Sequence, residues 1–199
     1  MLILIAVSLT AAAAGFSRVL AFDLTPGQQD TAPTLWPGPA GIDGGIKPAI
    51  QGNGGRSSLI LFAHPFCSCT HATISEIARV LNRHSRKDLP AIHVLFSRPE
   101  SVSRWKPGAL WVEAAALPGS SVSWDDGGRA AGQFGVRTSG TVLLYNARGV
   151  LRFAGGVTGS RGHAGDNFGS AALARALDGG KPAMRRFLVF GCSLGEFRK

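Results

Sequence analysis

An apolar run leads directly into two closely spaced cysteines and then into an amphipathic helix. The run, Ser58–Ala63, has the length and composition of a buried strand, and Cys67 and Cys69 follow it after a short turn. Over residues 70–83 the apolar positions fall on one face of a helix. A strand that passes into a helix predicts an α/β arrangement. The thiols then lie at a helix start, where unpaired N–H groups and the helix dipole favour the thiolate, the reactive form of cysteine.

The rest of the chain extends this arrangement. A Gly-rich loop, 155–169, precedes the last helix. The order β-α-β-α-β-α-β-β-α predicts a mixed central sheet with helices on both faces. Further strands are expected at 91–97, 121–124, 141–145 and 150–154, and further helices at 98–117 (a loose crossover), 128–134 and 170–177.

The two ends of the chain differ from this central part. Residues 1–22 are almost continuously apolar or small, which indicates a signal sequence or a membrane anchor and a domain facing the periplasm or the cell exterior. Residues 23–56, rich in Gly, Pro, Thr and Gln, are expected to form a linker. The folded domain is expected over 57–180, with a C-terminal extension over 181–199.

Composition excludes some classes of function. Hydrophobic residues make up 45% of the chain, which is enough for a substantial core. The net charge is +9, but Lys and Arg are scattered and no nucleic-acid-binding motif accompanies them, so no nucleic-acid partner is expected. We expect no cofactor. The partner indicated is a protein or small-molecule thiol or disulfide.

The order of elements and the position of the thiols together resemble the thioredoxin fold, in its exported or membrane-tethered thiol–disulfide branch. The similarity extends to peroxiredoxin-like proteins. In thioredoxin-like proteins an aromatic residue ends the strand five residues before the first active cysteine, as Phe62 does before Cys67. The segment 134–145 looks like the family's lead into its fourth strand. The stretch 64–69 and the loop 155–167 are similar to those of a narrower, RedB-like group.

Two positions depart from the family pattern. The family's second cysteine would fall at Thr70, whereas this sequence has Cys69 one residue earlier. The family's cis-proline aligns with Gly140, where we expect no cis bond. The proline keeps a backbone face available for substrate strands, so Gly140 argues against standard exchange with a protein substrate.

Five residues make up the candidate catalytic site. We expect Cys67 to be the nucleophile, Cys69 its resolving partner, and both thiols to meet solvent at an open mouth. A Cys-x-Cys disulfide closes a small ring, which favours an oxidising or isomerising centre. His64 precedes the thiols in the turn, where an imidazole can lower a thiol pKa or move its proton. Thioredoxin-like topology would bring Arg161 and His163, in the Gly-rich loop, to the same pocket.

Two other functions are compatible with these residues. A peroxiredoxin-like peroxide reductase would oxidise Cys67 to a sulfenic acid that condenses with Cys69, and Arg137 or Arg161 would stand near the thiolate. A copper(I)-binding module would use the two thiols and one histidine. The third cysteine, Cys192, is interpreted as a lone cysteine, and docking beside the site as a third thiol is the alternative.

Overall fold

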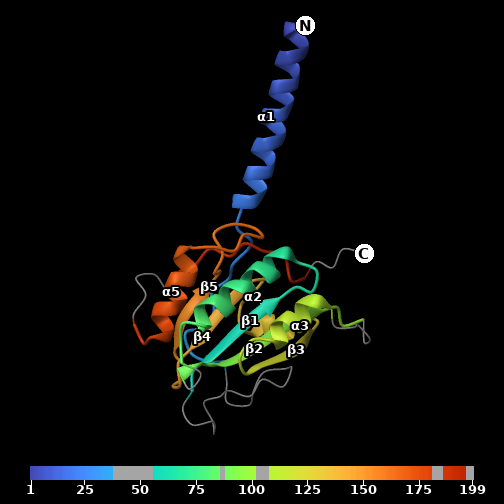
Figure 1. The fold of residues 1–199 in the computed structure, drawn as a ribbon. Helices are drawn as coiled ribbons and strands as arrows, with labels where there is room; N and C mark the ends of the chain where they lie inside the picture. The colour runs from blue at the N-terminus through green and yellow to red at the C-terminus, as the bar shows by residue number, and fades with distance from the viewer. Residues whose placement is uncertain (38–55, 86–87, 102–107, 181–185, 196–199) are drawn as a thin grey trace.

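The structure is a computed structural model that describes residues 1–37, 56–85, 88–101, 108–180 and 186–195. Its core is a six-stranded mixed sheet in the order β3-β2-β1-β4-β5-β6 (Figure 1). The strands are β1 (Ser58–Ala63), β2 (Ala91–Arg98), β3 (Ser120–Asp126), β4 (Thr141–Tyr145), β5 (Leu151–Gly155) and β6 (Arg186–Phe187). The helices are α1 (Leu2–Leu24), α2 (Ser68–Leu81), α3 (Ala109–Ala115), α4 (Arg129–Gln133) and α5 (Phe168–Leu177).

Helices cover both faces of the sheet, as the sequence predicts. Strands β1, β2 and β3 are parallel, whereas β4 runs antiparallel to β1 and β5. Leu59 and Leu61 of β1 pack in the hydrophobic cluster that includes α2, α3 and α5, and Ile60 and Phe62 pack in the cluster that includes α4. Both faces of β1 are therefore buried, which explains why its sequence is continuously apolar rather than alternating.

Part of the segment expected to be a linker packs against the domain. Trp36 is only 9% exposed, and its ring lies edge-on to Phe134 and Tyr145, with centroids 5.5 and 5.2 Å away. The backbone N–H of Trp36 donates to the carbonyl of Gly149 at 2.9 Å, and the Tyr145 hydroxyl donates to the carbonyl of Pro33 at 2.9 Å. The stretch 25–36 is therefore part of the folded unit rather than a free tether. The remainder of the expected linker, 38–55, lies outside the described residues.

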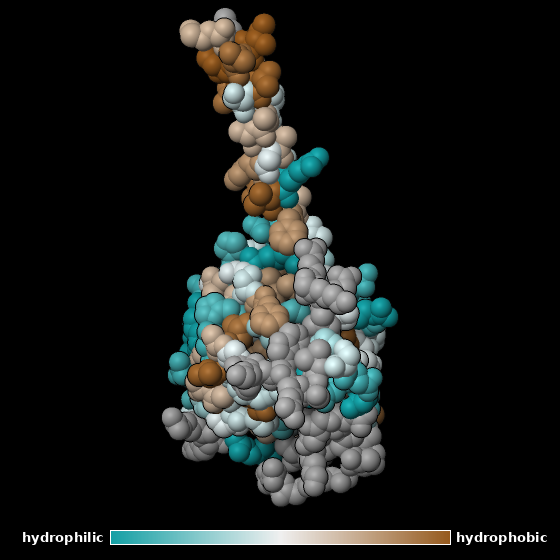
Figure 2. Space-filling model, turned by 90° about the vertical axis from the view of Figure 1, so that its right-hand side faces the viewer, coloured by the Kyte–Doolittle hydropathy of each residue, from teal (hydrophilic) through white to brown (hydrophobic). Residues whose placement is uncertain are grey.

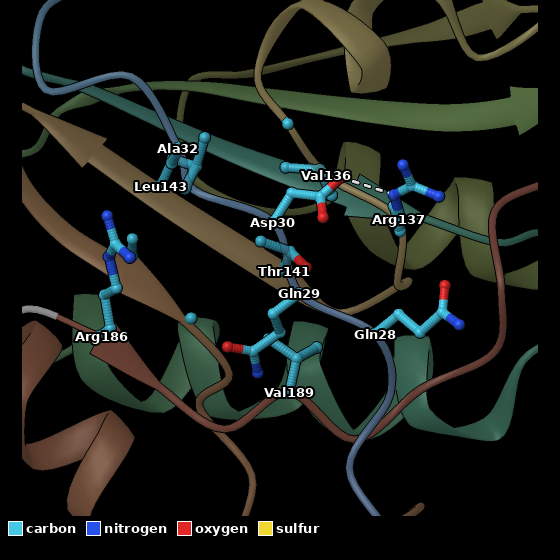
Figure 3. Close-up of a pocket in the computed structure, with 13 residues that line it drawn as sticks. Gln28, Gln29, Asp30, Ala32, Val136, Arg137, Thr141, Leu143, Arg186 and Val189 are labelled. Carbon is cyan, nitrogen blue, oxygen red and sulfur yellow. Dashed lines mark hydrogen bonds and ion pairs between the residues drawn. The ribbon is translucent and has the colours of Figure 1, made fainter.

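Where this stretch crosses the sheet it leaves a small cavity (Figure 3). The cavity lies between Gln28, Gln29 and the β4 residue Thr141, and its volume of about 30 Å³ is enough for about one water molecule. Beside it, Asp30 and Arg137 form an ion pair with an N–O distance of 2.5 Å. None of the three cysteines lines this cavity, so it is a packing seam rather than the thiol site.

Replacement of Trp36 by alanine tests whether the stretch 25–36 belongs to the folded unit. We expect the variant to lower the free energy of unfolding by about 3 kcal/mol, because a buried aromatic ring is lost. Leu35→Ala is the matched control, since Leu35 is 63% exposed and should change stability by less than about 0.5 kcal/mol. Denaturant unfolding of the full chain measures both values. If Trp36→Ala were as stable as the Leu35→Ala control and the wild type, this stretch would not contribute to folding.

Helix α1 projects away from the domain (Figure 1), and much of its surface is apolar (Figure 2). The window Ile3–Leu24 has a mean hydropathy of 1.9, and none of it is buried. At 1.5 Å per residue, the 23 residues of α1 extend over about 34 Å, which is enough to cross the hydrocarbon core of a bilayer. A signal sequence has the same length and composition, so these properties are common to an anchor and a cleaved signal.

Candidate thiol site

Cys67 lies at the N-cap of α2, directly after the turn that follows β1. Its backbone is extended, and its carbonyl accepts the N–H of Thr70 at 2.9 Å, which begins the helix. Cys67 and Cys69 are only 2% and 3% exposed. The expectation that these thiols meet solvent at an open mouth is therefore wrong. The reason is a C-terminal segment that covers them.

This segment, residues 186–195, is called the tail below. It begins with β6 on the edge of the sheet and then pairs antiparallel with the residues just before β4. The Ser139 N–H donates to the carbonyl of Cys192 at 2.8 Å, and the Cys192 N–H donates to the Ser139 hydroxyl at 2.9 Å. Gly191 permits this approach, because a Cβ at that position would collide with the carbonyl oxygen of Ser139. The tail is thus fixed by its backbone beside Cys67.

Three sulfur atoms converge at this point. The Sγ atoms of Cys192 and Cys67 are 2.9 Å apart, and the Ser139 hydroxyl donates to Cys67 Sγ at 3.4 Å. The Cys69 thiol also donates to Cys67. All three cysteines are free rather than joined in disulfides. The interpretation of Cys192 as a lone cysteine is therefore wrong, because the backbone pairing of the tail places it at the site.

Hydrogen bonds from the neighbouring thiols set the ionisation of this cluster. They lower the pKa of Cys67, with Cys192 contributing most and Cys69 next, while burial opposes the shift. The Ser139 hydroxyl and the N–H of Thr70 add smaller contributions in the same direction. The bonds to Cys67 raise the pKa values of Cys69 and Cys192, and burial raises them further. Cys67 thus carries the thiolate, and the helix start supports it less than the other two thiols do.

Arg161 of the Gly-rich loop reaches the site. Its guanidinium donates to the carbonyl of Gly191 in the tail at 2.6 Å and to the carbonyl of Phe22 at the end of α1 at 3.1 Å. Its charge favours ionisation of Cys69 and Cys192. His163, by contrast, is exposed, and its Nδ1 lies 2.7 Å from the carbonyl of Arg161. His163 therefore interacts with its own loop rather than with the thiols.

His64 is buried in the turn before the thiols, at 8% exposure. Its Nδ1 accepts the N–H of Phe66 at 3.3 Å. Burial lowers the pKa of His64, and the charge on Cys67 partly opposes this shift, so the imidazole is near enough to Cys67 to interact with it electrostatically. At neutral pH the structure thus places an uncharged imidazole beside the thiolate.

A buried carboxylate that the sequence analysis did not single out holds the Gly-rich loop in place. Glu76 of α2 is 2% exposed and accepts the N–H of Gly165 at 2.7 Å and the guanidinium of Arg79 at 2.5 Å. The only sequence signal is an acidic residue beside the apolar positions of the helix. The same loop donates the N–H of Gly162 to Cys69, so Glu76 helps to position the backbone that meets the thiols.

The copper(I) alternative needs two thiols and one histidine around one ion. Among the described residues, no group of three or more His, Cys, Asp or Glu side chains is arranged to hold a metal ion. The Sγ atoms of Cys67 and Cys192, 2.9 Å apart, are arranged as a hydrogen-bonded thiol–thiolate pair.

Comparisons with solved structures identify the architecture. Similar structures include a hypothetical protein from Sinorhizobium meliloti, with 15% identity, a TM-score of 0.59 and coverage of 88% of this chain and 96% of that chain. A thioredoxin-like protein solved in its oxidized form has 17% identity and a TM-score of 0.50, over 74% of this chain and 98% of that chain. This chain has the thioredoxin-like fold.

Another structure similar to this thioredoxin-like chain is an uncharacterized conserved protein from Geobacillus kaustophilus, with 17% identity and a TM-score of 0.59, over 88% of this chain and 94% of that one. The sequence matches no protein-family model and no curated protein. At these identities the similarity establishes the thioredoxin-like fold alone, so function has to be argued from the thiols.

Proposed function

We propose that this thioredoxin-like chain is a thiol–disulfide oxidoreductase whose nucleophile is Cys67. The observation that carries the proposal is the convergence of the Cys192 thiol and the Ser139 hydroxyl on Cys67 Sγ at the N-cap of α2, and these hydrogen bonds, with one from Cys69, lower the pKa of Cys67. A thiolate is the form of cysteine that attacks disulfides. The partner is a protein or small-molecule disulfide. Cys69, two residues along, is the resolving thiol that the sequence alone indicates.

The reaction exchanges one disulfide for another. The Cys67 thiolate attacks one sulfur of the incoming disulfide, and the other sulfur leaves as a thiolate with the electron pair of the broken bond. A second thiol of the chain then loses its proton and attacks the Cys67 sulfur of the mixed disulfide, which releases the remaining half of the substrate. The positive charge of Arg161 favours the second thiolate, whether Cys69 or Cys192 supplies it.

The proposed setting is outside the cytoplasm, with α1 as a membrane anchor or a signal sequence. Helix α1 is apolar and long enough to span a bilayer, and none of its apolar window is buried in the domain. In an oxidising compartment, disulfides of substrates and of the chain itself persist. Separation of the full-length protein into membrane and soluble fractions, with its apparent mass measured, tests this assignment. An intact chain in the soluble cytoplasmic fraction would exclude it.

The pH dependence of exchange tests the nucleophile. Because the pKa of Cys67 is lowered in the fold, its thiolate persists below the ordinary thiol pKa of about 8.5. We expect the rate constant for reaction of the reduced full chain with a small disulfide to stay nearly flat between pH 8 and pH 6. An ordinary thiol would lose roughly tenfold per pH unit over this range.

The denatured chain is the control, since unfolding restores ordinary thiol pKa values. A folded-state rate that titrates near pH 8.5 would contradict the proposal. Fast consumption of peroxide without any disulfide exchange would instead support the peroxide reductase.

A further inference from the structure

We propose that Cys192, rather than Cys69, is the redox partner of Cys67, and that the two close into a disulfide that joins the tail to the start of α2. This inference rests on the proposed exchange function and identifies its resolving thiol. It uses a residue 125 positions away from the nucleophile.

The tail holds Cys192 at the distance that the reaction requires. The two Sγ atoms are already 2.9 Å apart, slightly closer than the roughly 3–3.5 Å of a near-attack geometry. Two hydrogen bonds between Cys192 and Ser139 fix the segment on one side of Cys67: the Ser139 N–H donates to the Cys192 carbonyl, and the Cys192 N–H donates to the Ser139 hydroxyl. The preceding Gly191 allows the backbones to approach this closely. No element has to move for these two sulfurs to meet.

Cys69 is placed less favourably. Its thiol also hydrogen-bonds to Cys67, but a Cys67–Cys69 bridge would close a very small ring across one intervening residue, and such a ring departs from preferred disulfide geometry. The carbonyl of Cys67 accepts the N–H groups of Thr70 and His71, so a bridge to Cys69 would disturb the bonds that begin the helix. Cys69 also accepts a hydrogen bond from the N–H of Gly162, which holds it against the Gly-rich loop.

The two cysteines are oxidised in two successive attacks. The Cys67 thiolate attacks a disulfide R–S–S–R, the Cys67–S–R bond forms and one R–S⁻ leaves. Cys192 then loses its proton and attacks the Cys67 sulfur, so the Cys67–Cys192 bond forms and the second R–S⁻ leaves. The two cysteines have lost two electrons, and R–S–S–R has gained them and become two thiolates. In reverse, Cys67 is the better leaving group because its thiolate is stabilised.

The pKa of Cys192 depends on whether Cys67 has reacted, and this can set the order of the two attacks. The pKa of Cys192 is raised mainly by its hydrogen bond to Cys67, then by burial and by the negative charge of Cys67. Once Cys67 is in a mixed disulfide, its charge is gone and the first and third of these effects disappear. The positive charge of Arg161, which favours the Cys192 thiolate, remains. Cys192 therefore becomes more acidic when Cys67 has reacted.

Identification of the bridge tests the inference. The reduced full chain is treated with glutathione disulfide, the remaining thiols are alkylated, and the products are separated on a non-reducing denaturing gel and mapped by peptide mass spectrometry. We expect a peptide pair linked through Cys67 and Cys192. The loop of 125 positions makes the denatured chain more compact and speeds its migration, whereas a bridge to Cys69 would not.

Four variants sharpen the test. Cys69→Ser should still give the fast-migrating form, and Cys192→Ser should lose it and accumulate the Cys67–glutathione mixed disulfide. Gly191→Ala keeps every thiol but displaces the tail, so we expect bridge formation to slow by roughly tenfold or more. Ser193→Ala is the matched control, since the Ser193 side chain is exposed and the bridge should form at the wild-type rate.

Failure of the inference and failure of the proposed function have different signatures. A wild-type chain that forms the Cys67–Cys69 bridge, or a Cys192→Ser variant that resolves the mixed disulfide at the wild-type rate, overturns the inference and leaves exchange intact. A Cys67–Cys192 bridge that forms once with glutathione disulfide, in a chain that then catalyses no repeated exchange, confirms the pair and overturns the proposed function.

Discussion

Conversion of Cys67 to serine is expected to lower the rate of disulfide exchange by roughly 10³-fold or more, as is usual when a nucleophile is removed. A hydroxyl at this position is not ionised at neutral pH and cannot attack a disulfide. The substitution should also lower the pKa values of Cys69 and Cys192 toward the ordinary thiol range, because the hydrogen bond to Cys67 is the first cause of their rise. Turnover of a small disulfide and thiol titration measure the two effects.

Serine is close to cysteine in volume, so the fold should survive at this buried position. Thermal unfolding of the variant provides the check, and a midpoint within a few degrees of wild type makes the activity loss interpretable. Cys69→Ser serves as a matched thiol deletion and is expected to retain most of the exchange activity. Exchange by Cys67→Ser within tenfold of wild type would exclude Cys67 as the nucleophile.

Introduction of the family's proline at Gly140 is expected to destabilise the fold by about 4 kcal/mol or more. Gly140 has a φ of +83°, whereas proline requires a φ near −65°. Its N–H donates to the carbonyl of Phe62 at 2.8 Å, and proline has no N–H to donate. The substitution thus leaves a buried carbonyl unpaired directly before the thiol turn. Chemical denaturation of Gly140→Pro measures the loss.

The Gly140→Ala variant separates the effect of the positive φ from the effect of the lost N–H donor. Alanine keeps the N–H but is strained at positive φ, and its Cβ would lie 2.9 Å from the Oγ1 atom of Thr73. We expect a loss of about 2 kcal/mol, roughly half that of the proline variant. If Gly140→Pro were as stable as wild type, the segment before β4 would have to adopt another backbone, such as the one the family's cis-proline produces.

The centre of the fold could be predicted from sequence because its signals are local. Strand β1 is a continuous apolar run since both of its faces are buried, and helix α2 carries its apolar residues on one face. The cap of the last helix is also local, as Asn167 accepts the N–H of Ser170 at 2.8 Å. Helix α2 begins at Ser68, two residues before the start predicted from sequence, because Ser68 and Cys69 do not extend the apolar periodicity.

The contacts that complete the site could not be predicted in the same way. Cys192 meets Cys67 through backbone pairing between segments far apart in the chain, and backbone pairing has no characteristic residue pattern. Trp36 lies in a Gly- and Pro-rich stretch whose composition indicates a linker, yet one buried ring anchors it to the domain. The orientation of His163 is equally hard to predict. It lies in the predicted loop, but its side chain is exposed and its Nδ1 lies 2.7 Å from the carbonyl of Arg161.

Arg161 connects the end of α1 to the tail, and this connection orients the domain relative to α1. Its guanidinium bridges the last turn of α1 and the tail, and it stacks over the Phe22 ring at 4.7 Å. The Gly-rich loop and the tail accordingly lie at the end of the domain from which α1 rises (Figure 1). In a retained anchor, this geometry would place the sulfur cluster at the membrane-facing end of the domain. Its reach would then be confined to disulfides presented at the bilayer surface, and freely diffusing proteins would have to approach the membrane to react.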